Sequence, residues 1–284
     1  MLKNCLIVLF AYIFSGSIHA QANLLNSKTV SQIGKKNEQQ LAADNDVPIP
    51  YGYIDDRDVL WSKVVWEFID LNQKINLPYY FPIDTTNIST NRRSLFDTLL
   101  KGIRQGRIAE VYSDSFFTSK ITQKEMDSRL VNIREEDGYK DTFRIQTPDV
   151  EGYMIKGIWY FDKRQGELKY RLLALAPMGR DVQTLGVSEI EDEDLYELFW
   201  VFFPSIREVL HFAKVFNPEN AVQSISFDHL LNARRFNSVI VREENIYGNR
   251  AISDYVRGNS LFQLLEANKI KEDIRNKEMD MWNY

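Results

Sequence analysis

The sequence predicts an α+β fold, in which helices are mixed with a small antiparallel sheet that contains a central hairpin. Two strand-like runs, 153–161 and 167–175, flank a turn and predict the hairpin, while several amphipathic stretches predict helices. These segments do not alternate regularly as strand, helix and strand, so a parallel sheet is not indicated. A hydrophobic content of 44% in 284 residues suits one globular domain with an ample core.

The first twenty residues have the pattern of a secretory signal peptide. Lys3 precedes an apolar run, 6–14, and small residues then lead to Ala20. The apolar run is far shorter than the roughly 20 residues that a membrane-spanning helix needs. The single cysteine, Cys5, lies before the apolar run and is not placed for lipid attachment. We therefore expect an exported chain without disulfide bonds.

Composition divides the chain into three parts. We expect the signal peptide at 1–20, a flexible polar arm at 21–46 and a globular domain at 47–284. The arm lacks aromatic residues and cannot bury enough apolar surface to order itself, so it is either a spacer or a tail that orders on a partner. The formal net charge is -5 and there is no long basic run, which argues against nucleic acid as a partner.

The stretch from Pro48 to Pro82 is expected to organise the rest of the chain. Its middle, 58–72, has apolar residues at helical spacing and predicts a central core helix. A proline-bearing segment at each end, 48–51 and 76–82, predicts an extended strap that fixes where the helix starts and stops.

Two further helices and a strand are predicted before the hairpin. Ser94 begins a helix to 104, and a capping box of Thr122 and Glu125 begins another that reaches about residue 132. Residues 108–112 predict a short strand.

In the second strand of the hairpin, alternation predicts that Leu168, Tyr170, Leu172 and Ala174 share one face. A five-residue turn, 162–166, joins the two strands.

The last third of the chain predicts further strands and helices. An acidic run at 189–194 precedes an apolar run at 195–203 that favours a buried strand. We also expect a helix from Pro204 to about 213, a turn at 217–220, a helix over 227–235 capped by Ser226 and a strand over 236–242. The tail predicts two helices broken at Gly258.

No motif for catalysis or metal binding stands out, so we expect no catalytic residue, no cofactor and no metal site. His211 and His229 have no partner at ligand spacing, and the Glu135–Glu136 and Glu243–Glu244 doublets read as solvated charge at element ends. The tryptophans at helix or strand spacing favour core packing. The alternative is a secreted carbohydrate-binding or carbohydrate-active protein that uses aromatic and carboxylate side chains.

Aromatic-rich sequence segments across the chain resemble those of the GldN/PorN family of gliding-motility and type IX secretion proteins. These segments lie at 48–51, 58–63, 66, 69–71, 74–78, 94–97, 159–163, 175–177, 215–218, 235–236, 243–245, 247, 249–252 and 280–282. Within them, the candidate core positions of the motif are Trp61, Trp66, Asp70, Pro78 and Trp159.

The resemblance implies a non-enzymatic periplasmic subunit that lies at the outer membrane through a lipidated partner. Family members form a ring complex with a GldK- or PorK-type lipoprotein and with like neighbours, and they contact the periplasmic part of a GldM- or PorM-type motor. The arm 21–46 and the charged segment after Asn259 are the expected contacts, because neither is obviously needed for the core.

The signal-peptide pattern predicts cleavage after Ala20 or after Ala22. N-terminal sequencing of the exported protein should then begin at Gln21 or Asn23. Recovery of an intact Met1 terminus in the cytoplasm would contradict export.

Overall fold

The computed structural model describes residues 47–83, 92–136, 139–185, 194–215 and 225–282, all of which belong to one compact unit of the chain. The expected signal peptide, the arm, the turn at 217–220 and most of the acidic run at 189–194 lie outside the described residues.

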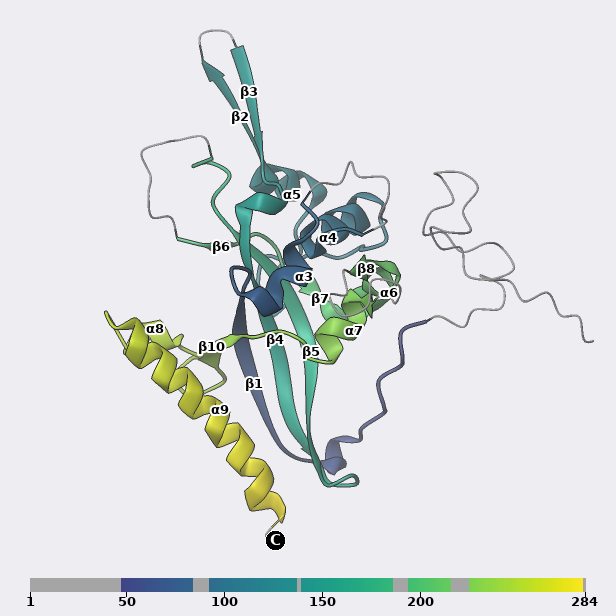
Figure 1. The fold of residues 1–284 in the computed structure, drawn as a ribbon, viewed down its shortest axis with the longest axis vertical. Coiled ribbons are helices and arrows are strands. Elements are labelled where there is room, and N and C mark those ends of the chain that lie inside the picture. The colour runs from purple at the N-terminus through teal and green to yellow at the C-terminus, as the bar shows by residue number, and fades with distance from the viewer. Residues whose placement is uncertain (1–46, 84–91, 137–138, 186–193, 216–224, 283–284) are drawn as a thin grey trace, which may run out of the picture. The chain divides into compact units, whose positions relative to one another are not determined.

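An antiparallel sheet with strand order β10-β1-β4-β5-β6 forms the centre of the described fold, and β7 also pairs with β5 (Figure 1). Its strands are β1 (Val59–Asp70), β4 (Val150–Asp162), β5 (Glu167–Gly179), β6 (Tyr196–Glu197), β7 (Val201–Phe202) and β10 (Val239–Glu243). Strands β4 and β5 are the predicted hairpin. The α+β prediction is confirmed.

The predicted central helix over 58–72 is wrong, because this segment forms β1. β1 pairs with β4 along almost its full length and with β10 on its other side. Val65 and Ile69 are buried on one face of the sheet and Trp66 on the other. Because β1 has apolar residues on both faces, its sequence lacks the alternation of apolar and polar residues that identifies a strand. Its β-branched and aromatic residues nevertheless favour a strand.

The alternation predicted for β5 fails at one position. The pairing between β4 and β5 shifts between Lys156 and Gly157, so that Leu173 is an extra residue in β5. As a result Leu172 packs in the large core, whereas Ala174 packs beside Trp66 on the other face. At the turn, Asp162 still pairs with Glu167, so the connection is shorter than predicted.

The largest core lies between one face of the sheet and five helices. These helices are α3 (Leu77–Tyr80), α4 (Leu95–Arg104), α5 (Gln123–Leu130), α6 (Phe203–Phe212) and α7 (Phe227–Asn232). The helix predicted from Ser94 is α4, which the Ser94 hydroxyl caps, and Ser226 caps α7 as predicted; each hydroxyl accepts a backbone N–H of the first turn. α6 has Pro204 in its first turn, also as predicted. α7 ends three residues earlier than expected.

Several short segments differ from the predictions. The second predicted strap is not extended, because Pro78 lies in the first turn of α3. The buried strand predicted over 195–203 is reduced to β6 and β7, and Phe203 already begins α6. In the predicted strand at 108–112, Tyr112 alone makes ladder contacts, as isolated bridges to Lys120 and Trp200.

A hairpin of two further strands extends from the capped helix α5. The helix α5 (Gln123–Leu130) has the predicted capping box and leads into β2 (Val131–Glu136) and β3 (Tyr139–Arg144), which pair only with each other in the described chain (Figure 1). The remaining short elements are β8 (Lys214–Val215), β9 (Ile225–Ser226) and the 3-10 turns at Asp56–Asp58, Lys74–Asn76 and Thr147–Asp149.

The C-terminal helix is part of the core. The predicted break at Gly258 separates α8 (Ile252–Tyr255) from α9 (Ser260–Trp282). Ala267, Ile270 and Ile274 of α9 are buried against β1 and β10. The expectation that the segment after Asn259 is dispensable for the core is therefore wrong.

Trp66 is buried on the face of the sheet opposite to the large core. Its indole N–H donates to the Ser115 hydroxyl at 3.0 Å. The ammonium of Lys156 lies 4.9 Å from the Trp66 ring centroid and donates to the Ser115 carbonyl, and burial lowers the pKa of this lysine. Trp66 thus attaches the 108–121 segment to the sheet.

An ion pair is buried in the middle of β1. Arg234 donates two hydrogen bonds to the Glu67 carboxylate, at 2.7 and 3.1 Å, and the Ser238 hydroxyl donates a third. The Arg234 guanidinium also lies 4.0 Å from the centroid of the Tyr170 ring. Burial opposes ionisation of Arg234, but the Glu67 carboxylate raises the pKa of this arginine above its ordinary value.

Trp66→Ala should lower the free energy of unfolding by about 3–5 kcal/mol, because it opens a cavity and leaves Ser115 without its donor. Thermal melting of the purified protein measures the loss. Trp61→Ala is a matched control in the same strand, and it should cost less because Trp61 is only partly buried. Equal losses for the two variants would contradict the role assigned to Trp66.

Arg234→Met should cost about 3–5 kcal/mol, because it leaves the Glu67 carboxylate buried without its cation. Adding Glu67→Gln should recover much of the loss, which a double-mutant cycle in urea measures. The exposed neighbour Arg235 is the control, and Arg235→Met should be nearly neutral. Additive effects of the Glu67 and Arg234 substitutions would contradict the coupling.

Candidate functional site

The five motif positions do not meet in one site. Trp66 is buried on one face of the sheet, whereas Trp61 and Trp159 pack on the other face beside the α9 core. Asp70 ends β1, where its carboxylate accepts the Asn72 backbone N–H at 2.9 Å, and Pro78 lies in α3. Their contacts are those of a scaffold, spread over two cores.

The residues considered for chemistry lie apart in the described part of the chain. His211 lies in α6 and His229 in α7. A group of three or more His, Cys, Asp and Glu side chains that could hold a metal ion is not found among the described residues. Glu243 forms an ion pair with Lys63, and Glu135 forms one with Lys140.

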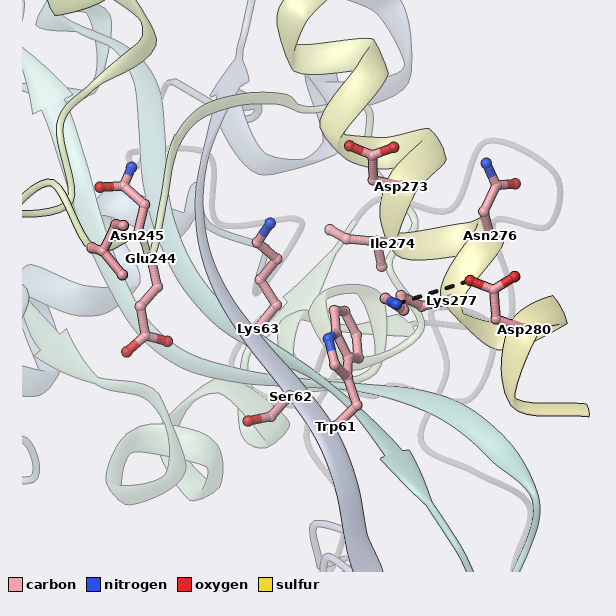
Figure 2. A pocket seen from close by; sticks show the side chains of 11 residues that line it. Trp61, Ser62, Lys63, Glu244, Asn245, Asp273, Ile274, Asn276, Lys277 and Asp280 are labelled. Carbon is pink, nitrogen blue, oxygen red and sulfur yellow. Dashed lines mark ion pairs between the residues drawn. The ribbon is translucent and has the colours of Figure 1, made fainter. Parts of the chain in front are cut away.

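A groove of about 750 Å³ runs between β1 and the C-terminal half of α9 (Figure 2). Trp61 and Lys63 contribute from β1, Glu244 from the segment after β10, and Asp273 and Lys277 from α9. Figure 2 shows Lys277 extending from the helix toward Trp61. The groove combines one aromatic ring with side chains of both charges.

Both lysines that line this groove form ion pairs. Lys277 lies 3.9 Å from the carboxylate of Asp280, and Lys63 pairs with Glu243 of β10. An aromatic ring beside paired charges of both signs suits a contact with another protein surface. The groove is therefore a candidate contact surface.

An apolar surface lies at the start of α9, and sequence analysis did not identify it. Leu261, Phe262, Leu264 and Leu265 are between 43% and 60% exposed. Helical spacing in the sequence could have indicated this surface. The buried side of α9 is formed by Ala267, Ile270 and Ile274, which recur at that spacing. Four apolar residues within five positions cannot all lie on that stripe.

The segment before β1 is fastened to the folded unit by Tyr51. The centroid of the Tyr51 ring lies 4.2 Å from the guanidinium of Arg207 and 4.7 Å from that of Arg171, and the Tyr51 hydroxyl donates to Asn232 at 2.8 Å. Burial raises the pKa of the Tyr51 hydroxyl, although Arg207 opposes this. Arg207 is itself paired with buried Asp228. Tyr51 thus attaches the segment before β1 to α6 and α7.

Among the described residues, we find no helix with an apolar stretch that could span a bilayer. A comparison with curated proteins gave no match.

A comparison with family models gave one that matches residues 54–283, described as gliding motility associated protein GldN. The match includes every strand of the main sheet, the groove of Figure 2 and the apolar surface of α9. Proteins of this family are components of the gliding motility and type IX secretion machinery. The chain belongs to the GldN family.

Proposed function

We propose that the chain is a non-enzymatic structural subunit of the type IX secretion and gliding motility machinery, located in the periplasm. The family match over residues 54–283 carries the proposal. The subunit binds a GldK- or PorK-type outer-membrane lipoprotein and like neighbours in a ring, and it contacts the periplasmic part of a GldM- or PorM-type motor.

The described surfaces support a role in assembly. The groove beside α9 offers paired charges, and the start of α9 exposes four large apolar side chains. Exposed apolar clusters of this kind are typical of protein contact sites. The globular unit 47–284 forms the body of the subunit, and the 21–46 arm is a further contact with the lipoprotein.

Affinity purification of the tagged full-length protein from detergent-solubilised envelopes tests this function. The protein should co-purify with the lipoprotein in a large assembly. Purification as a free single chain under conditions that preserve other envelope complexes would contradict the proposal.

Deleting residues 21–46 should leave a folded protein, because Tyr51 and the described unit remain intact. The deleted form should lose most of its association with envelopes, measured by sedimentation, while its melting temperature stays unchanged. Replacing the arm with a Gly/Ser linker of equal length is the matched control for spacing. If the deleted form still sediments with envelopes, the contact lies on the globular unit.

A further inference from the structure

Strand β10 has an open edge in the described structure. One side of β10 pairs with β1. On its other side the described chain supplies a single bridge, between Arg242 and Ala251, which leaves Val239–Val241 without a neighbouring strand. An open edge presents backbone donors and acceptors that can pair with another strand.

An apolar hollow of about 490 Å³ lies against this open edge. Ile252 of α8 and Leu261 and Leu264 of α9 form its wall, and Val239 and Val241 lie on the strand side. Backbone groups on one side and apolar side chains on the other are the features with which proteins bind an added β-strand. The hollow therefore fits an extended segment that places an apolar side chain between α8 and α9.

The same chain carries a second pair of strands with open edges. β2 and β3 form a separate two-stranded sheet, which extends beyond α5 in Figure 1. Ile133 in β2 is 63% exposed. Local support comes from Arg134, which lies 4.8 Å from the Phe143 ring and donates to the Gln183 carbonyl. A two-stranded ribbon is only marginally stable alone, and a third strand stabilises it.

We propose that β2 of one copy pairs with the Val239–Val241 edge of a second copy and places Ile133 in the hollow formed by Ile252, Leu261 and Leu264. The proposal rests on the proposed function, because it specifies the contact between like neighbours. β2 and β10 have similar lengths, six and five residues.

A second copy suits both features better than another occupant does. Each copy has one open ribbon and one open sheet edge, and a single contact covers one of each. Because the two surfaces differ, the contact is head-to-tail and leaves an unused ribbon and an unused edge for the next copies. Within one chain, the β2–β3 ribbon contacts the large core through Val131 and the Gln183 carbonyl through Arg134, and in the described residues β2 pairs with β3 and not with β10.

Cysteine cross-linking in cells tests this contact directly. Full-length chains carry Cys5→Ser, which removes the one natural cysteine, together with either Ile133→Cys or Leu264→Cys. Co-expression of the two variants followed by mild oxidation should give a disulfide-linked dimer, because a disulfide requires Cα atoms about 4.4–6.8 Å apart. Neither variant alone should give the dimer. Ile75→Cys, at a similarly exposed apolar position, is the control and should not link to Leu264→Cys.

A failure of the Ile133→Cys and Leu264→Cys pair to link, in protein that still co-purifies with the lipoprotein, would overturn this contact and leave the proposed function standing. Linkage of Leu264→Cys with itself would also overturn it, since it would indicate a symmetric contact. Loss of lipoprotein association in the unsubstituted protein would instead contradict the proposed function.

A charge substitution gives an independent measurement. Ile133→Lys should leave the melting temperature unchanged, because the side chain is exposed, and should reduce the detergent-extracted assembly to small species in sedimentation. Ile75→Lys is the matched control and should leave the assembly size unchanged. An unchanged assembly with Ile133→Lys would overturn the contact.

Discussion

The buried ion pair between Glu67 and Arg234 joins segments that are far apart in the sequence. Glu67 lies in the centre of β1, while Arg234 follows α7, so the pair fixes the chain between α7 and β10 against the sheet. The Ser238 hydroxyl also binds Glu67, and the Ser238 carbonyl accepts from Lys271 of α9. A buried carboxylate without these donors would be strongly destabilising. The position of β10, and through it that of α9, therefore depends on this pair.

Aromatic packing around the ion pair explains a constraint on β4. The Tyr170 ring beneath Arg234 crosses over Gly157, where an added Cβ would lie 2.1 Å from the Tyr170 hydroxyl oxygen. A side chain at this position would displace the ring from the guanidinium. Tyr170 also packs against both the large core and the α9 core. The glycine in β4 thus allows one tyrosine to connect the two cores and to cover the buried charge.

Local signals in the sequence were sufficient for most helices and for the central hairpin. Ser94 and Thr122 form caps within one turn of the chain, so neighbouring residues determine them. β1 was wrongly predicted as a helix because both of its faces are buried. This burial depends on pairing with β4 and β10 and on covering by the segment at 108–121, which are distant in the sequence. The extra residue Leu173 in β5 likewise reflects pairing across strands. Family membership could be predicted from sequence segments shared with the family. The open edge of β10 could not be predicted, because it depends on which strands pair.

The surfaces left open by the fold follow from the way α9 packs. The helix uses Ala267, Ile270 and Ile274 to cover β1 and β10, and this leaves Leu261 and Leu264 at its start beside the uncovered edge. Exposed apolar residues beside an open edge promote self-association, and many proteins block such edges with charge or proline. Val239–Val241 carries neither, and its irregularity is a β-bulge at Val241, which the pairing with β1 skips. A subunit that works in an assembly has a physical reason to keep this edge open, because the same backbone groups that would cause aggregation in a free protein can specify one neighbour.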